Sequence, residues 1–365
     1  MKCKICKSEK LSEIVDLGLQ PLANKYPKNI QEKIKEKKYP LKIIFCNSCK
    51  SAQIKKIIDR NLLFTNYYYL SSINNKLKKH FKNLSLKLKK YDFIVDIGSN
   101  DGILLEPLKK MNKLAIGIDP SINVGRIANS KGLKTFISFF NKEIIKKILN
   151  KYPKPDLIVA SSVVTHLENP KRFVRDIKSF LKKDGVLIIE IEYFKNFIKN
   201  TEFERFYFDR PFYYSAYSIN YMFKNVGMTL YDIEKINIHG GSIRCFVKNN
   251  LEIKQTNKCK EIISEELSLL KIKSFQKFKK NIYSEADYLF KKLSNYKKQS
   301  KYIIGYGAPA RVSAITNIAK IDSELISFII DDSPLKQNRF TPGMHIKILP
   351  RKRNISTKID IVIVF

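Results

Sequence analysis

The sequence has no hydrophobic run long enough to cross a membrane. Its longest apolar runs, such as Gly185-Val-Leu-Ile-Ile189, have the length of a strand, whereas a transmembrane helix needs about 20 apolar residues. The N-terminus, Met1-Lys-Cys-Lys-Ile-Cys6, also lacks the apolar core and the small-residue cleavage site of a secretory signal. These absences exclude a membrane span and indicate a cytoplasmic protein whose cysteines stay reduced.

Tryptophan is absent and acidic residues are scarce. The chain has 34 Asp and Glu against 69 Lys and Arg, which gives a formal net charge of +35. Such an excess is typical of proteins that bind nucleic acid, anionic membranes or phosphorylated ligands. The lysines are spread over every segment, however, and isoleucine and asparagine are abundant as well. We therefore favour a compositional bias and expect no nucleic-acid partner.

A chain of 365 residues is long enough for two or three domains. Residues 1–60 carry four of the six cysteines and few helical signals, so they predict a small metal-dependent domain. Residues 61–250 begin with a helical entry segment and then alternate between strands and helices. Residues 251–365 predict a charged helical connector followed by a second α/β unit. An α/β domain rarely stops inside a strand, so truncation of this last domain at Phe365 is one interpretation.

Short β-runs alternate with helical patterns in the second and third segments. They lie at residues 92–97, 114–118, 156–160, 185–190, 302–307, 325–330 and 360–365. Strands that alternate with helices form a parallel, doubly wound sheet covered by helices on both faces. The expected fold class is therefore α/β.

Four cysteines form two closely spaced pairs, Cys3-x2-Cys6 and Cys46-x2-Cys49. Four thiolates complete a closed tetrahedral Zn2+ site, which has no open position for catalysis and is therefore structural. The 39 residues between the pairs exceed the spacing of a zinc finger, so a loop or subdomain must return the second pair to the first. A redox disulfide is the alternative for either pair. Cys245 and Cys259 stand alone, and we expect them to be ordinary buried residues.

The segment Val95-Asp-Ile-Gly-Ser-Asn-Asp-Gly-Ile103 lies between a β-run and a helix. Its glycines let the backbone approach a ligand, and free N–H groups at the start of the helix bind polar atoms. The glycines stand four apart, which differs from the dinucleotide Gly-x-Gly turn. Asp119 ends the next strand, where a carboxylate can accept both ribose hydroxyls of an adenosine. This order favours the S-adenosylmethionine site of class I methyltransferases over an ordinary βα turn.

A second glycine turn, Gly305-Tyr-Gly-Ala-Pro-Ala310, does fit the Gly-x-Gly-x-x-Ala dinucleotide pattern. Asp331 or Asp332 follows a later strand at the interval that this pattern requires. The proline inside the turn and the lack of downstream strands argue against a complete NAD site. An NAD-linked oxidoreductase would also leave the loop at residues 96–102 without a role.

With these motifs the chain resembles the three-domain sugar C-methyltransferases. That family joins an N-terminal zinc-binding domain, a class I methyltransferase core with a Rossmann-like sheet and a C-terminal Rossmann-like α/β domain. The resemblance covers nearly the whole chain. Matching stretches lie at residues 17–24 with 45–46, 67–72, 96–102, 117–120, 163–170, 239–244, 305–310 and 336–343.

The resemblance implies site residues for both ligands. For S-adenosylmethionine they are Asp96, Gly98, Asn100, Gly102, Asp119 and Ser162. For the substrate they are the residues of the Tyr-rich stretch, Tyr67, Tyr69, Ser71 and Ser72. The resemblance also gives the C-terminal domain a role on the substrate side, through contacts to a sugar nucleotide.

Members of the family methylate a carbon beside a keto group of a nucleotide-linked deoxysugar. A base removes the acidic proton, and the enolate carbon attacks the methyl group of S-adenosylmethionine. The family carries a Tyr-His-Glu-His signature, and the aligned residues here are Tyr207, Phe208, Asp209 and Arg210, so both histidines are lost. Arg210 stays charged and cannot readily accept a proton, although it can bind an oxyanion or a diphosphate.

Three hypotheses follow from this departure. Another residue is the base, namely His166, Asp209 or His239; or the acceptor is an easier oxygen or nitrogen atom; or activity is lost. His166 follows the third strand and matches a family histidine beside the cofactor. His239 precedes Gly240 and Gly241, where a turn-stabilising hydrogen bond is as plausible as a substrate contact. His80 and His345 offer no functional argument.

The sequence thus predicts a cytoplasmic S-adenosylmethionine-dependent methyltransferase that acts on a small nucleotide-linked sugar, at carbon rather than oxygen or nitrogen. The alternatives are transfer to oxygen or nitrogen of a sugar or glycan precursor, and a catalytically inactive paralogue. A zinc-containing RNA methyltransferase would need a basic and aromatic stripe near the metal, and no such clustering is present. Monomer and homodimer both stay open.

Overall fold

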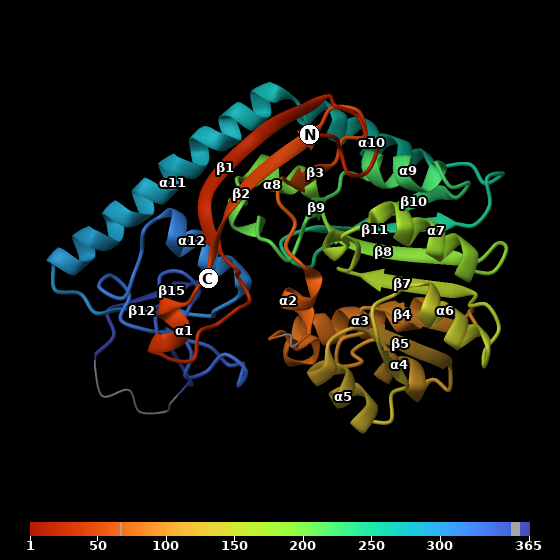
Figure 1. Cartoon of the computed structure of the whole chain (residues 1–365), viewed down its shortest axis with the longest axis horizontal. Coiled ribbons are helices and arrows are strands. Elements are labelled where there is room, and N and C mark those ends of the chain that lie inside the picture. Colours follow the sequence, from red (N-terminus) through yellow and green to blue (C-terminus); the bar gives the residue numbers. More distant parts are fainter. Residues whose placement is uncertain (66–67, 352–357) are drawn as a thin grey trace.

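The protein contains three β-sheets joined by helices (Figure 1). The computed structural model describes residues 1–65, 68–351 and 358–365. Tyr67, one of the residues expected to bind substrate, lies outside the described residues. None of the helices in the described parts of the chain is long and apolar enough to span a membrane.

The first sheet has the order β1-β2-β3-β9 and is antiparallel. Its strands are β1 (Leu11–Pro21), β2 (Lys38–Cys46), β3 (Ala52–Ile54) and β9 (Phe212–Tyr213), and the short helix α1 (Ile30–Ile34) joins β1 to β2. β9 comes from the second segment of the chain. Phe45 packs against Phe275, with ring centroids 4.8 Å apart. The N-terminal segment therefore shares its core with later parts of the chain.

The second sheet has seven strands in the order β10-β11-β8-β7-β4-β5-β6. They are β4 (Phe93–Ile97), β5 (Leu114–Asp119), β6 (Thr135–Ile137), β7 (Leu157–Ser161), β8 (Val186–Glu192), β10 (Thr229–Ile236) and β11 (Ser242–Lys248). β4 to β8 run parallel, whereas β11 is antiparallel to β8. All residues of β4 and β8 are buried, as expected for a parallel sheet with two covered faces. The four β-runs predicted in this segment all form strands.

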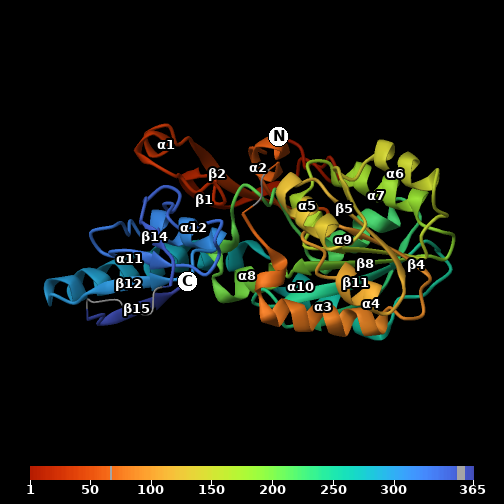
Figure 2. The same ribbon diagram turned by 90° about the horizontal axis from the view of Figure 1, so that it is seen from below.

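Helices cover both faces of this sheet (Figure 2). They include α3 (Asn75–Lys87), α4 (Leu105–Lys110), α5 (Ile122–Ser130), α6 (Lys142–Leu149), α7 (Pro170–Phe180), α9 (Ala216–Lys224) and α10 (Asn257–Leu269). Each buries an apolar stripe; in α3, for example, Leu77, Phe81 and Leu84 face the core. The side chain of Asn169 caps α7 by accepting a hydrogen bond from Arg172 N, and Pro170 occupies the first turn. The α/β class predicted from the alternating pattern is confirmed.

The connector is helical. It consists of α10 and α11 (Ile272–Lys298), and α11 extends away from the seven-stranded sheet to pass beside the C-terminal strands (Figure 1, Figure 2). Those strands are β12 (Ile303–Tyr306), β13 (Ile329–Ile330), β14 (Ile348–Leu349) and β15 (Ile361–Val364), in the parallel order β14-β13-β12-β15. Helix α12 (Ala310–Ile318) follows β12 directly.

The strand expected at residues 325–330 was predicted too long, because only Ile329–Ile330 pair in the sheet. Leu325 and Ile326 are buried in the C-terminal core without strand pairing. The amide of Ile326 instead donates to the carbonyl of Asp322 in a turn, at 3.0 Å. An apolar run indicates that a segment is buried, and a buried segment need not form a strand.

Candidate active site

A cleft of about 550 Å³ opens at the carboxyl ends of the parallel strands of the second sheet. This is where ligands bind in open α/β sheets, and the volume suits a small organic ligand. Residues that follow β4, β5, β7 and β8 line it, and so do Asn24 from the first segment and Pro309, Ala310, Arg311 and Lys336 from the C-terminal segment. All three parts of the chain thus contribute to one cleft.

The glycine loop after β4 and the end of β5 form one wall of the cleft. Asp119 is buried, and its carboxylate accepts hydrogen bonds from the backbone amides of Asn100 and Ser121, both at 2.9 Å. Gly98 has φ +73°, and a Cβ there would lie 2.2 Å from Val163 Cγ2, so this position requires glycine. Gly98, Asn100, Asp119 and Ser162 all line the cleft. A carboxylate held at this place suits the ribose of an adenosine.

Two residues expected at the cofactor lie behind this wall. Asp96 is buried in β4, and its burial raises the pKa of its carboxyl group. Gly102 has φ +85°, and a Cβ there would come within 2.3 Å of Leu133 Cδ1. Neither residue lines the cleft. Asp96 and Gly102 instead contribute to the shape of the loop that carries Gly98 and Asn100.

The stretch expected to bind substrate is tied to the glycine loop. Ser71 lies in the 3-10 helix η1 (Ser71–Ile73), and its amide donates to Asn100 Oδ1 at 3.0 Å. Asn100 Nδ2 donates in turn to the carbonyl of Tyr69 at 3.1 Å. Ser72 donates its hydroxyl hydrogen to Asp101. Tyr69 and Ser71 line the cleft, whereas Ser72 does not.

His166 also lines the cleft and lies in the 3-10 helix η2 (Val164–His166) that follows β7. Its Nδ1 is hydrogen-bonded to the backbone carbonyl of Asp209. Because a carbonyl only accepts, Nδ1 carries the hydrogen and Nε2 of the neutral ring keeps its lone pair. Burial, assisted by the charge of Arg210, lowers the pKa of His166 to about 4. His166 is therefore a neutral proton acceptor near pH 7.

Arg210 and Glu192 form an ion pair beside His166. Burial opposes ionisation of Glu192, but the charges of Arg210 and His239 outweigh it and bring the pKa of Glu192 to about 2. The Arg210 guanidinium also lies 4.9 Å from the centre of the Tyr207 ring. Burial raises the pKa of Tyr207, so its phenol stays protonated and can donate a hydrogen bond. All of these side chains line the cleft.

His239 and Asp209 differ in their position relative to the cleft. His239 has φ +47° in the turn that it forms with Gly240 and Gly241 between β10 and β11; its side chain lines the cleft, and burial lowers its pKa. Asp209 does not line the cleft. Its carboxylate is fully buried and accepts a hydrogen bond from Asn24 Nδ2 at 2.6 Å. The contact that Asp209 makes with the site is its backbone carbonyl on His166.

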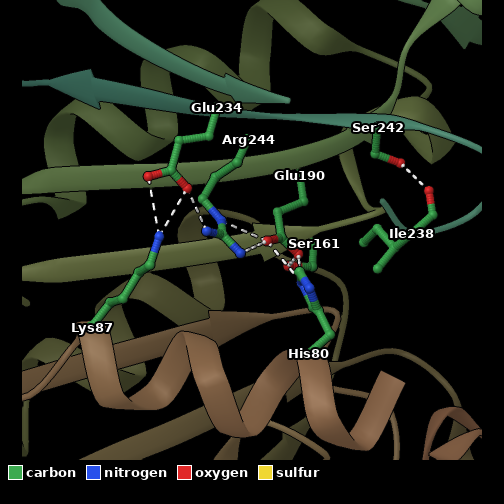
Figure 3. Close-up of polar contacts among 8 residues, drawn as sticks. All are labelled: His80, Lys87, Ser161, Glu190, Glu234, Ile238, Ser242 and Arg244. Carbon is green, nitrogen blue, oxygen red and sulfur yellow. Dashed lines mark hydrogen bonds and ion pairs between the residues drawn. The ribbon is translucent and has the colours of Figure 1, made fainter. Parts of the chain in front are cut away.

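A buried polar network centred on Glu190 lies next to the cleft (Figure 3). Glu190 Oε1 and Oε2 each lie 3.0 Å from His80 Nε2, Oε1 accepts from Arg244 Nε at 2.7 Å, and Oε2 accepts from the Ser161 hydroxyl at 2.8 Å. Arg244 also pairs with Glu234 at 2.7 Å. Burial opposes ionisation of Glu190, but His80 and Arg244 lower its pKa overall. Ser161 lines the cleft, so the network reaches the site.

Sequence reasoning missed several of these residues. Glu192, Arg205, Arg311, Lys336, Asn24 and the partners of Glu190 were not singled out. For His80 the sequence holds one signal. It is a polar residue next to Phe81, at the edge of the apolar stripe of α3. Asn24 and Lys336 lie in stretches that match the family, but nothing local assigns them to the cleft, since Asn24, for example, meets Asp209 across 185 positions.

The four paired cysteines come together as predicted. Their sulfur atoms all lie within 4.8 Å of one another, with Cys3 and Cys49 separated by 3.7 Å and Cys6 and Cys46 by 3.4 Å. A tetrahedral zinc site with Zn–S bonds of about 2.3 Å places its sulfurs about 3.8 Å apart. The arrangement therefore fits one zinc ion held by four thiolates. Cys245 and Cys259 are buried and lie outside this cluster, as expected.

The two cysteine pairs share one backbone geometry. In the first, the amide of Lys7 donates to the carbonyl of Cys3; in the second, the amide of Lys50 donates to the carbonyl of Cys46, both at 2.9 Å. Lys7 and Lys50 have φ +66° and +58°. Each turn presents two sulfurs to the same side. The loop that returns the second pair to the first is the β1–β2 hairpin, which ends at Cys46.

Comparison with known proteins agrees with this description of the fold. Residues 69–233 match the sequence model of a methyltransferase domain, residues 3–64 match one described as "Putative zinc binding domain", and residues 237–365 match the C-methyltransferase C-terminal domain. The fold and the cleft thus define an S-adenosylmethionine-dependent methyltransferase of class I with a structural zinc site. The chain matches all three domain models, zinc-binding, methyltransferase and C-methyltransferase C-terminal, in the order expected from the resemblance, which is thereby confirmed.

Individual known proteins are similar to the chain over different lengths. C-methyltransferase NovU of Streptomyces niveus is 24% identical over 356 residues, which is 95% of this chain and 85% of NovU. The ubiquinone biosynthesis O-methyltransferase of Pelagibacter ubique is 27% identical over 96 residues, 26% of this chain and 40% of that protein. Among solved structures, magnesium protoporphyrin IX methyltransferase from Synechocystis PCC 6803 covers 47% of this chain and 78% of its own, at 14% identity and a TM-score of 0.36.

Proposed function

We propose that the protein methylates a carbon beside a keto group of a nucleotide-linked sugar. The observation that carries this proposal is the state of His166. Its Nδ1 is hydrogen-bonded to the Asp209 carbonyl, its ring is neutral, and its side chain lines the cleft. A neutral imidazole with a free Nε2 lone pair is suited to act as a general base. It takes over the role for which the family uses histidines at the positions of Phe208 and Arg210.

In the proposed reaction, Nε2 of His166 accepts the proton from the carbon next to the keto group. The electron pair of the broken C–H bond moves into the enolate, whose oxygen gains negative charge. The protonated phenol of Tyr207 donates a hydrogen bond to that oxygen, and the positive charge of Arg210 stabilises it further. Bound S-adenosylmethionine would supply an electrophilic methyl group on a sulfonium; the new carbon–carbon bond would form as the S–CH3 bond breaks, and the sulfonium would leave as a neutral thioether without further activation.

The low pKa of His166 makes it a weak base in the protein without substrate, and two effects offset this. The groups that stabilise the enolate lower the pKa of the C–H bond, so a weaker base suffices. A substrate with a negatively charged diphosphate also counters the charge of Arg210, the second cause of the depressed pKa. Arrival of such a substrate therefore raises the pKa of His166 toward its ordinary value.

Basic side chains from several segments support a phosphorylated substrate. Arg60, Arg205, Arg311 and Lys336 line the same cleft as His166. Arg311 stands in the first turn of α12, and the N-terminus of a helix favours anions. Lys336 donates to the carbonyl of Ala308 at 2.9 Å, so the dinucleotide-like turn at residues 305–310 is braced by the protein's own side chain. We propose that this side of the cleft binds the diphosphate of a sugar nucleotide.

Transfer to oxygen is the competing proposal. The ubiquinone biosynthesis relatives are O-methyltransferases, although each matches only part of the chain. His166 can deprotonate a hydroxyl group as readily as a carbon acid, and Arg210 stands where the family has a histidine. The two proposals differ in the atom that carries the new methyl group.

The experiment uses purified, zinc-loaded protein with S-adenosylmethionine carrying a 13C-labelled methyl group. The probes are the thymidine and uridine diphosphate forms of 4-keto-6-deoxyglucose. We expect a product that has gained one methyl in place of one proton, with a carbon–carbon coupling to the label in its NMR spectrum. His166→Asn should lose the reaction while it still binds S-adenosylmethionine. A methoxy signal would favour transfer to oxygen, and cofactor binding without transfer to either probe would contradict the proposed substrate class.

A further inference from the structure

Glu190 and Glu192 lie two residues apart at the carboxyl end of β8, so their side chains project from the same face of the sheet. Both are buried, with exposed fractions of 0% and 3%. Protein groups bind both carboxylate oxygens of Glu190, as Figure 3 shows. Glu192 differs from it. Arg210 binds Oε1 of Glu192, whereas Oε2 is buried and has no hydrogen-bond partner in the described parts of the chain.

An unpartnered oxygen on a buried carboxylate is costly. The usual penalty for a buried polar group without a partner is about 1–3 kcal/mol, and it is larger for a charged group. Buried polar atoms of native proteins nearly always have a partner, and an exception inside a binding cleft points to a ligand or to solvent. Glu192 lines the cleft and Glu190 does not. The residue that carries the unmet oxygen therefore belongs to the wall of the binding site.

The sheet order places Glu192 at the substrate end of the cleft. β8 lies beyond β7 from β4 and β5, whose carboxyl ends carry Gly98 and Asp119. Arg210 and Tyr207 are the side chains gathered beside Glu192. A group that meets Glu192 Oε2 is therefore part of the acceptor and not of the adenosine.

We propose that Oε2 of Glu192 accepts a hydrogen bond from a hydroxyl group of the acceptor sugar, which makes Glu192 a specificity-determining residue. The inference rests on the proposed function and deepens it. The local charge favours a neutral donor over an ammonium group. Arg210 already neutralises Glu192, and the other nearby arginine, Arg205, is itself paired with Glu202 at 2.6 Å. An ammonium group would therefore find no unpaired negative charge at Glu192, whereas a hydroxyl group needs none.

A site that hydrogen-bonds a substrate hydroxyl rejects the analogue that lacks it, because the buried acceptor is then left unpaired. The test therefore compares probes with and without the group. They are thymidine diphosphate 4-keto-6-deoxyglucose and its 2-deoxy and 3-deoxy analogues, each with S-adenosylmethionine. The readout is kcat/KM for methyl transfer. We expect the wild-type protein to prefer the hydroxylated probe over one of the two analogues by about 10- to 100-fold.

Removal of the acceptor should remove the preference. In Glu192→Leu we expect the hydroxylated probe and that analogue to react within about 3-fold of each other, mainly through a loss with the hydroxylated probe. Because this variant leaves Arg210 without its partner, Glu192→Leu combined with Arg210→Leu provides a second version with no buried unpaired charge. The matched control is Asp176→Asn, which alters another buried, arginine-paired carboxylate, in α7 and outside the cleft, and should keep the wild-type preference.

Equal turnover of all three probes by the wild-type protein would overturn the inference and leave the proposed function standing. Faster turnover of a 3-amino probe than of its 3-hydroxy counterpart would overturn the assignment of a hydroxyl. Loss of the preference in Asp176→Asn would also overturn it, since the effect would then not belong to the cleft. Binding of S-adenosylmethionine without transfer to any keto probe would contradict the proposed function, and this inference with it.

Discussion

The backbone amide of Asn100 donates a 2.9 Å hydrogen bond to Oδ2 of Asp119 and thereby joins the glycine loop to the end of the neighbouring strand. The second oxygen of Asp119 accepts from the amide of Ser121 at the same distance. Two backbone amides thus hold the carboxylate before any ligand arrives. Preorganisation of this kind lowers the entropic cost of binding.

Asp119→Ala should therefore weaken binding of S-adenosylmethionine by about 10- to 100-fold, because the variant loses a charged hydrogen-bond acceptor and releases the loop at Asn100. Isothermal titration calorimetry measures the affinity. Asp156→Asn is the control. Asp156 lies just before β7, at the amino end of that strand, whereas the cleft lies at the carboxyl ends of the strands; its carboxylate pairs with Lys182 at 2.6 Å. Equal affinities of the two variants would refute the role of Asp119.

His166→Asn should reduce kcat by about 10²- to 10⁴-fold, the usual contribution of a general base. Asparagine keeps a donor near the Asp209 carbonyl but has no basic nitrogen. The affinity for S-adenosylmethionine should stay within about 3-fold of the wild type, since Asp119 and Gly98 are untouched. Parallel calorimetry and steady-state kinetics separate the two effects. A variant that keeps its kcat would move the role of base to His239 or Asp209.

The acid limb of kcat/KM should lie well below pH 6.5. Burial lowers the pKa of His166 to about 4, so the folded protein keeps the ring neutral over a range in which an exposed histidine would be protonated. The same shift affects stability. Between pH 6.5 and about 4 the unfolded chain binds a proton at this position and the folded chain does not, so stability falls as the pH falls.

Urea unfolding across this pH range, compared between wild type and His166→Asn, isolates the contribution of His166. The difference between the two stability profiles should change by at most about 3 kcal/mol from pH 7 to pH 4. A kinetic acid limb close to pH 6.5 in the wild-type protein would show that the titrating base is not buried as His166 is.

Loss of one zinc ligand should release the metal. Cys46→Ser removes one of four buried or half-buried sulfurs, and a structural zinc site contributes directly to folding. We expect the zinc content to fall from about one ion per chain to near zero and the unfolding temperature to fall by at least about 5 °C. Elemental analysis and differential scanning fluorimetry measure both. Cys245→Ala, in β11, should keep its zinc; unchanged zinc in Cys46→Ser would contradict the four-thiolate site.

The network in Figure 3 should contribute more to stability at its centre than at its rim. Glu190→Gln should lower the free energy of unfolding by about 3–5 kcal/mol, because Arg244 is then buried without its full counter-charge. Lys87→Ala should cost less than about 1 kcal/mol, because the Lys87 side chain is 57% exposed and pairs with Glu234 in solvent. Urea denaturation of both variants is the measurement. Equal losses would mean that burial does not set the energetics of the network.

Much of the fold, and the part of the cleft formed by Gly98 and Asp119, could be predicted from local sequence motifs. The runs of β4, β5, β7 and β8 are mostly apolar and mostly buried, so their strands could be predicted from the sequence. The turn at Gly98 and the strand end at Asp119 are defined by neighbouring residues, and both line the cleft. The cysteine pairs were equally visible, because each lies within four consecutive residues.

The substrate end depends on contacts between distant segments, which one sequence does not reveal. Asn24 reaches Asp209, and Lys336 lines the same cleft as His166 although 170 positions separate them. Glu192 looks like one more residue of a buried strand until Arg210 is placed beside it. The pairing of β9 with β3 likewise joins two segments of the chain that share no pattern. Long-range packing decides these features, and local propensity does not.

The most direct test of the account is solvent deuterium exchange at the carbon beside the keto group. Thymidine diphosphate 4-keto-6-deoxyglucose is incubated in D2O with the protein and S-adenosylhomocysteine, so that deprotonation occurs without methyl transfer. We expect the wild-type protein to incorporate deuterium at that carbon much faster than the protein-free solution, and His166→Asn to match the protein-free rate. A wild-type protein that transfers methyl groups but incorporates no deuterium would contradict carbon-directed transfer through His166.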